Sequence, residues 1–119
     1  MYIGEVAKRT GLSIKAIRFY EAKGLIPPPL RQGNYRLYRD SDLELLSLLA
    51  EARQLGIPLA RLQGAIRYRD GQVDWQRIQQ FLLEVKQQFI TEQQRLAEQI
   101  SRLERCLSAL DGCPLNHTS

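Results

Sequence analysis

The sequence predicts a mainly α-helical protein with one small β-hairpin, and three patterns carry this prediction. Two short amphipathic segments flank Gly11, a proline-rich stretch leads to Gly33-Asn34, and residues 74–110 contain neither proline nor glycine. These patterns are typical of a pair of short helices, a hairpin and one long helix, in that order.

The first helix follows from apolar spacing. Ile3, Val6 and Ala7 recur at helical spacing, and Gly11 provides the permissive backbone that a tight turn needs. Ser13 is a natural N-cap for a second helix over residues 14–23. Two helices joined by a glycine turn suggest a helix-turn-helix unit, although many helical proteins contain this pattern without binding nucleic acid.

The second helix divides its side chains between two environments. We expect Ile17 and Phe19 to point inward and Lys15, Arg18 and Tyr20 to remain available on other faces. In a helix-turn-helix unit the second helix lies in the major groove of DNA, where long hydrogen-bond donors reach base edges and phosphates. The three available side chains are therefore candidate DNA contacts.

The next segment predicts a β-hairpin, or wing. The prolines at 27–29 stop the helix and hold the chain extended, and Gly33-Asn34 can take the positive φ values of a hairpin turn. Arg31 and Arg36 near this turn suit phosphate or minor-groove contacts.

Two tyrosines of the wing have two possible roles. Along the second strand, alternation places Tyr35 and Leu37 on one face and Arg36 and Tyr38 on the other. Both tyrosines are candidate DNA contacts, and the alternative for either is that it covers a small core.

Two connector helices are predicted before the long helix. Residues 41–44, Ser-Asp-Leu-Glu, match a capping box, and Gly56 should end the helix that they open. The repeat of this helix is Leu43, Leu46, Ala50 and Arg53. Pro58 should start the second connector, and Asp70-Gly71 should close it. Its apolar residues are Leu59, Leu62 and Ile66.

The long helix, about 50 Å if continuous, is too long to pack on so small a head and needs a partner helix. A seven-residue repeat runs through Leu82, Phe89, Leu96, Leu103 and Leu110. Its flanking apolar residues are Ile78 and Val85 at the start and Ile100 and Leu107 at the end. Because the flank changes sides, the pattern fits a helix that meets different surfaces at its two ends better than one uniform zipper. The dimerisation residues would be Leu82, Phe89, Leu96, Ile100, Leu103 and Leu107.

Charge and composition restrict the function further. Residues 1–39 contain eight basic side chains and only two acidic ones, both glutamates, which gives a net charge of +6. Residues 40–119 contain nine basic and eleven acidic side chains, which gives a net charge of −2. A basic head followed by a mildly acidic remainder favours a polyanion-binding module. One histidine, no nucleophile motif and no phosphate-binding glycine loop leave little for an enzyme.

The chain also lacks a long apolar run and a signal-peptide pattern, so we expect a cytoplasmic protein with no membrane partner. Two cysteines are too few for a disulfide scaffold.

Several motifs together resemble the MerR family of bacterial transcription regulators. They are the opening Ile-Gly-Glu-Val-Ala at 3–7, the Gly-Leu-Ser turn at 11–13, the Ile-Arg-Phe-Tyr-Glu segment at 17–21 with Gly24-Leu25, the Gly-Asn-Tyr-Arg-Leu-Tyr wing at 33–38 and the Ala-Arg-Gln-Leu-Gly segment at 52–56. The resemblance is strong to about Tyr68 and architectural beyond it. It implies that Arg18, Tyr20, Arg36 and Tyr38 contact operator DNA.

The resemblance also implies a mechanism. The long helices of two chains would form an antiparallel coiled-coil pair and so make a twofold homodimer. Its winged helix-turn-helix heads would bind a pseudo-palindromic site in an overlong promoter spacer and would bend and untwist the DNA, so that RNA polymerase engages both promoter elements. The organisation expected is a winged helix-turn-helix DNA-binding domain with connectors at 1–70, a dimerisation helix at 71–110 and a short tail at 111–119 as a candidate effector loop.

The effector remains open at this point. Because the chain stops soon after Leu110, we expect no separate ligand-binding domain like those of the drug-sensing members. Cys113 lies where metal-sensing relatives carry a ligand, and with His117 it could share a zinc-like divalent ion. Asp74 is the closest match to the partner-subunit ligand of those relatives, but it serves equally well as an N-cap.

Other interpretations compete. The second cysteine that metal sensors carry farther along the loop is missing here, and Cys106, between Leu103 and Leu107, is better explained as a packed residue than as a ligand. Cys113, with or without Cys106, can act instead as a thiol switch. Alternatively the tail has no sensing role, or an unrecognised ligand is held between the helices. Outside transcription, the alternatives are an architectural or excisionase-like DNA-binding protein and a helical adaptor that binds no DNA.

Overall fold

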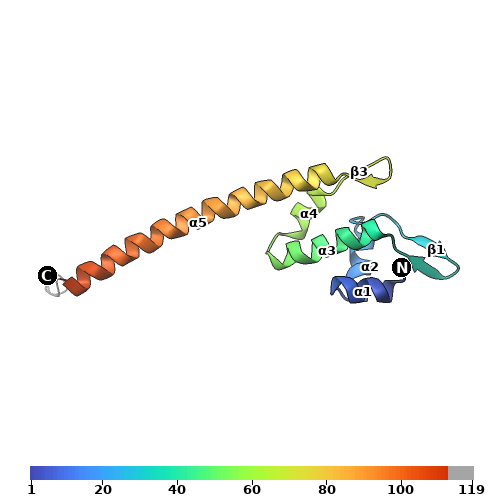
Figure 1. Ribbon diagram of the computed structural model, residues 1–119, viewed down its shortest axis with the longest axis horizontal. Coiled ribbons are helices and arrows are strands. Elements are labelled where there is room, and N and C mark those ends of the chain that lie inside the picture. Colours follow the sequence, from blue (N-terminus) through green and yellow to red (C-terminus); the bar gives the residue numbers. More distant parts are fainter. Residues whose placement is uncertain (113–119) are drawn as a thin grey trace. The chain divides into compact units, whose positions relative to one another are not determined.

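The computed structural model describes residues 1–112 of the chain (Figure 1). The chain consists of two compact units, Met1–Ile78 and the segment from Gln79 onward. The first unit contains four helices, the start of a fifth and two small hairpins. Within the described residues, no helix has both the length and the apolar character that crossing a membrane requires.

The helix-turn-helix pair forms as predicted. Helix α1 spans Ile3–Thr10 and α2 spans Ile14–Ala22. Gly11 lies between them with a φ of 77°, a left-handed conformation that favours glycine. The Ser13 Oγ accepts a hydrogen bond from the backbone N–H of Ala16 at 3.0 Å, so Ser13 is the N-cap of α2.

The inward face of α2 differs from the prediction. Ile17 is fully buried, but the second buried residue of the helix is Tyr20 and not Phe19. The physical reason is helical spacing, since residue i+3 shares the face of residue i whereas residue i+2 lies on the opposite side. The predicted inward position of Phe19 and outward position of Tyr20 are therefore both wrong.

The wing consists of β1, Leu30–Gln32, and β2, Tyr35–Leu37, paired antiparallel. Of the two turn residues only Gly33 has a positive φ, 61°. A single positive φ at the first central position fits a type II′ turn better than a type I′ turn.

Helix α3, Asp40–Gln54, begins earlier than the predicted capping box. Asp42 Oδ2 accepts a hydrogen bond from the backbone N–H of Arg39 at 2.9 Å, so Arg39 occupies the N-cap position and Asp42, which is almost fully buried, caps it. Ser41 and Glu44 are therefore not the capping pair.

The buried face of α3 is also displaced around the helix from the predicted repeat. It consists of Asp42, Leu45, Leu46, Leu49 and Ala52. Only Leu46 belongs to both sets, and Arg53 is exposed. The α3 helix ends before Gly56, which has a φ of 84°, as predicted.

After Pro58, helix α4 spans Leu59–Ala65 and is much shorter than predicted. Asp70-Gly71 does not close a helix, because it forms the turn of a second hairpin between β3, Tyr68–Arg69, and β4, Gln72–Val73. Both turn residues have positive φ, 55° and 77°, which is the conformation of a type I′ turn.

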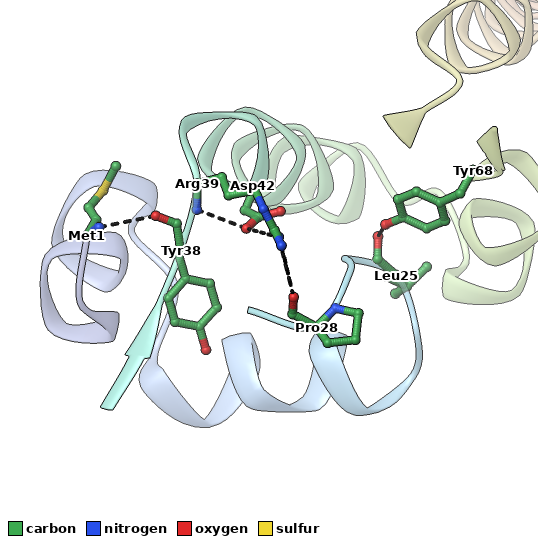
Figure 2. A network of polar contacts seen from close by, with 7 residues as sticks. All are labelled: Met1, Leu25, Pro28, Tyr38, Arg39, Asp42 and Tyr68. Atoms are coloured by element: carbon green, nitrogen blue, oxygen red, sulfur yellow. Dashed lines mark hydrogen bonds and ion pairs between the residues drawn. The ribbon is translucent and has the colours of Figure 1, made fainter. Parts of the chain in front are cut away.

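Polar contacts hold the first unit together around its apolar core (Figure 2). The amino group of Met1 donates to the carbonyl of Tyr38 at 3.1 Å, and the N–H of Tyr38 donates back to the carbonyl of Met1 at 2.8 Å. The Arg39 guanidinium donates to the carbonyl of Pro28 at 3.3 Å. These contacts fix the exit of the wing against both α1 and the turn after α2.

Helix α5 spans Trp75–Gly112, as the absence of proline and glycine between 74 and 110 predicts. Asp74 Oδ1 accepts a hydrogen bond from the N–H of Arg77 at 3.2 Å, so Asp74 is an N-cap. The α5 residues Ile78 and Val85 are buried.

Candidate nucleic-acid interface

The outward face of α2 carries two of the predicted DNA contacts. Lys15 and Arg18 are exposed there together with Phe19 and Ala22, at positions i, i+3, i+4 and i+7 of one helical face. Because Ile17 and Tyr20 occupy the opposite, buried face, both basic side chains point away from the core. This outward face is defined here by Lys15, Arg18, Phe19 and Ala22.

Phe19 is the residue of this face that the sequence analysis misplaced. Its side chain is 44% exposed, its ring lies edge-on to that of Tyr20 with centroids 5.8 Å apart, and Lys23 Nζ is 5.5 Å from its centroid. The i+3 spacing between Ile17 and Tyr20 is the sequence signal that could have found this arrangement.

In the wing, Arg31 lies directly opposite Arg36 in the β1–β2 register. Like charges at directly opposed positions destabilise an antiparallel pair, so folding alone does not favour this arrangement. Tyr35 is 68% exposed and its ring lies edge-on to that of Tyr2 at 5.6 Å. The Tyr2 hydroxyl also donates to Gln32 Oε1 at 3.2 Å, so Tyr2 contacts both strands of the wing.

Arg36 is partly covered and has an acidic neighbour. Its Nε lies 3.4 Å from Glu21 Oε2, which joins the wing to α2 through an ion pair, although Nε itself has no hydrogen bond within the described residues. Glu21 is thus a counterion of the wing that sequence reasoning did not identify.

The two remaining predicted contacts, Tyr20 and Tyr38, are buried. The hydroxyl of Tyr38 has no hydrogen-bond partner in the described part of the chain. Burial first, and then the Glu21 carboxylate, raises the pKa of Tyr38. Of the predicted DNA contacts, Lys15, Arg18, Arg31 and Tyr35 are therefore exposed and Arg36 is partly exposed, whereas Tyr20 and Tyr38 are buried.

The predicted metal ligands do not form a cluster in the described residues, where no three histidine, cysteine or acidic side chains gather in a way that could hold a metal ion. Asp74 caps α5 and pairs with Arg69 at 3.6 Å, so its oxygens already have partners. Cys113 and His117 lie outside the described residues. Cys106, expected to be packed, is exposed on α5 of the single chain.

The predicted dimerisation residues lie on α5. Leu82 is half-buried, and the others form an exposed apolar stripe with exposed fractions between 46% and 62%. The stripe consists of Phe89, Leu96, Ile100, Leu103 and Leu107.

Residues 1–69 match the family model described as MerR HTH family regulatory protein. The HTH-type transcriptional regulator CueR of Salmonella typhi is 58% identical over 60 residues, which are 50% of this chain and 44% of CueR. The heavy metal-dependent transcription regulator 2 of Rhizobium meliloti is 35% identical over 114 residues, 94% of this chain and 75% of that protein. The chain thus spans about half the length of the CueR relatives that it matches.

Solved structures agree with this match. The transcription regulator PbrR691 from Ralstonia metallidurans, in complex with lead(II), has a TM-score of 0.56 and 27% identity and covers 88% of this chain and 84% of its own. The N-terminal part of MtaN, the multidrug transporter activator of Bacillus subtilis, has a TM-score of 0.59 and 26% identity, with 90% and 97% covered. On the family match over more than half of its length, this chain belongs to the MerR family of HTH regulatory proteins, which are transcription regulators and not enzymes.

Proposed function

We propose that this chain binds a pseudo-palindromic promoter site as a homodimer and distorts the DNA to control transcription. The observation that carries the proposal is the basic outward face of α2 beside a wing that opposes Arg31 and Arg36. Either feature alone would be a weak indication. Together, a helix with exposed basic residues and a basic hairpin in one module match the way in which winged helix-turn-helix domains bind duplex DNA.

Within this proposal the two parts of the head have different tasks. Lys15 and Arg18 on α2 enter the major groove, where an arginine reads guanine by two hydrogen bonds. Arg31 and Arg36 of the wing contact phosphates, which add affinity but little sequence information. Tyr35, which is exposed at the turn end of the wing, adds a contact to the DNA backbone.

The dimer proposal rests on the apolar stripe of α5. Exposed side chains at a seven-residue period need a partner helix, and a twofold dimer delivers two heads to two half-sites. Bending the DNA between the heads costs on the order of 1–6 kcal/mol, which the phosphate contacts of both wings would offset. The distorted promoter would then engage RNA polymerase.

Selection from a random duplex library with the full chain, followed by footprinting, tests this function. We expect an enriched site with two inverted half-sites. Arg18→Ala should weaken binding to the selected site by a factor that corresponds to about 1–3 kcal/mol and leave binding to unrelated DNA nearly unchanged, whereas Arg36→Ala should weaken both. Binding without any enriched sequence would instead indicate an architectural DNA-binding protein, and absence of binding would leave the helical adaptor.

A metal ion is the effector class that the relatives favour, because one is named heavy metal-dependent and another was solved with lead(II). We propose Cys113 and His117 as ligands of a zinc-like divalent ion, since a single thiolate with an imidazole suits borderline cations. Asp74 does not fit this metal site, because its carboxylate oxygens already cap α5 and pair with Arg69.

Metal content of the untagged protein, purified without oxygen, tests the effector proposal. We expect stoichiometric zinc-like metal that is lost in Cys113→Ser and retained in Cys106→Ser, the matched cysteine on α5. Protein that neither holds nor takes up metal would contradict the proposal and would turn the search toward a thiol switch.

A further inference from the structure

The outward face of α2 contains an apolar residue that the proposed function does not use. Phe19 lies between Lys15 and Ala22 on this face and is 44% exposed, although a phenylalanine gains its stabilisation by burial. The core does not need it, because Ile17 and Tyr20 fill the inward positions of the helix. The ring lies on the same exposed face as the basic residues Lys15 and Arg18, so it can contact whatever partner these residues bind.

The Phe19 ring is held in place before any partner arrives. One side meets the ring of Tyr20 at an interplanar angle of 61°, and the buried Tyr20 cannot move away easily. Lys23 Nζ lies over the ring at 5.5 Å from the centroid, within the range of a cation–π contact. These two contacts restrict the ring, so little conformational entropy is lost when another surface packs against it.

The charges around Phe19 indicate which surface that is. Lys15, Arg18 and Lys23 flank the ring, and three cations around an apolar centre disfavour a second basic head as the partner. A duplex suits this pattern, because its phosphates attract the cations and its major groove offers one apolar group, the 5-methyl of thymine.

We propose that Phe19 is a specificity-determining residue that packs against the 5-methyl group of one thymine in each half-site. This inference rests on the proposed DNA-binding function and adds an apolar readout to the hydrogen bonds of Arg18. It assigns to Phe19 the discrimination of thymine from cytosine at one position, since cytosine lacks the methyl group.

Deoxyuridine substitution tests the contact directly, because it removes the methyl group and keeps base pairing. In the selected duplex, each thymine is replaced in turn by deoxyuridine in both half-sites, and the dissociation constant is measured for the wild type, Phe19→Ala, Phe19→Leu and Leu55→Ala. Leu55→Ala is the matched control, because it removes an apolar side chain of similar exposure, 53%, at the end of α3.

We expect one thymine position at which deoxyuridine weakens the wild type on the order of tenfold, the effect of two buried methyl groups. Phe19→Ala should lose this sensitivity, Phe19→Leu should keep part of it, and Leu55→Ala should keep all of it. Melting curves that coincide for the four proteins show that folding is not the cause.

Two results would overturn the inference: a half-site in which no thymine methyl affects binding, and a Phe19→Ala variant that remains as sensitive to deoxyuridine as the wild type. Both leave the proposed function intact, because neither result bears on whether the selection enriches a site with two inverted half-sites.

Discussion

The carboxylate of Glu21 on α2 lies 3.4 Å from Nε of Arg36 on β2 and links this helix to the wing. Both side chains are partly buried, with exposed fractions of 16% and 32%, so solvent screens this pair less than an exposed one. The geometry is that of an ion pair without a hydrogen bond at Nε. We expect this ion pair to hold the hairpin, with its two opposed arginines, in one position relative to α2.

We expect Glu21→Gln to lower the free energy of unfolding of the head by about 1 kcal/mol, because Arg36 would lose its counterion beside Arg31. Urea unfolding followed by the fluorescence of Trp75, the one tryptophan of the chain, measures this at fixed protein concentration. Glu5→Gln is the control, since it breaks the ion pair between Glu5 and Arg9, and both of these side chains are about half exposed. If Glu21→Gln costs no more than Glu5→Gln, the pair does not hold the wing.

Stability at high pH should depend on Tyr68. Its hydroxyl donates to the carbonyl of Leu25 at 2.7 Å, and burial, followed by the Asp42 carboxylate, raises the pKa of Tyr68 to about 12. An unfolded tyrosine titrates near about 10, so the folded state binds this proton more tightly. The resulting stabilisation is therefore complete below pH about 10 and is lost as the pH rises toward about 12.

Urea unfolding between these two pH values should show a steeper loss of stability for the wild type than for Tyr68→Phe. Tyr35→Phe serves as the control, because Tyr35 is 68% exposed and its variant should follow the wild type. Tyr38, whose pKa is also raised by burial, should contribute to the loss that remains in every variant. Parallel curves for the wild type and Tyr68→Phe would contradict this role of Tyr68.

Local rules explain which parts of this fold were predictable. Gly11, Ser13 and Asp74 act within one turn of their own position, as a turn residue and two caps, so a few neighbouring residues suffice to identify them. Long helices without proline or glycine are equally visible, as α5 shows.

The elements that the sequence patterns predicted wrongly depend on packing partners, or on a dipeptide that occurs both at helix ends and in hairpin turns. Arg39 is not a usual cap residue, and Asp42 caps α3 from a buried position that the sequence pattern does not reveal. Asp70-Gly71 ends helices and also forms type I′ hairpins, and the flanking Tyr68 and Val73 were the signal for the hairpin. The exposure of Lys15, Arg18 and Arg31 was predictable because charged side chains stay in water by default, whereas the exposure of Phe19 required knowledge of which face the core uses.

Two glycines should respond in opposite directions to alanine. Gly71 has a φ of 77°, where a Cβ strains the backbone, so Gly71→Ala should destabilise the head by about 1–2 kcal/mol. Gly64 lies in α4 with open space around the position of a Cβ, so Gly64→Ala should stabilise the head by about 0.5–1 kcal/mol. Trp75 fluorescence during urea unfolding measures both. A Gly71→Ala variant as stable as the wild type would show that the second hairpin does not need its type I′ turn, and a destabilised Gly64→Ala variant would contradict the expectation for α4.

The apolar stripe of α5 predicts the assembly state. Replacing Ile100 and Leu107 by lysine places two charges on the stripe, and the pair should weaken self-association by at least about 100-fold, because each apolar side chain contributes about 1.5–3 kcal/mol when buried. Sedimentation velocity at micromolar concentration should then show a dimer for the wild type and a monomer for the variant.

Ser101 and Ser108 provide a matched control, because each follows one of these residues directly and is exposed on the same helix. Ser101→Lys with Ser108→Lys adds the same two charges at the same spacing but beside the apolar stripe, and this variant should remain dimeric. Since two heads on one site bind cooperatively, the Ile100→Lys and Leu107→Lys variant should also lose the selected full site while each head still binds a half-site weakly. A monomeric wild type, or a control that dissociates as readily as the stripe variant, would refute the assignment of this stripe to the dimer.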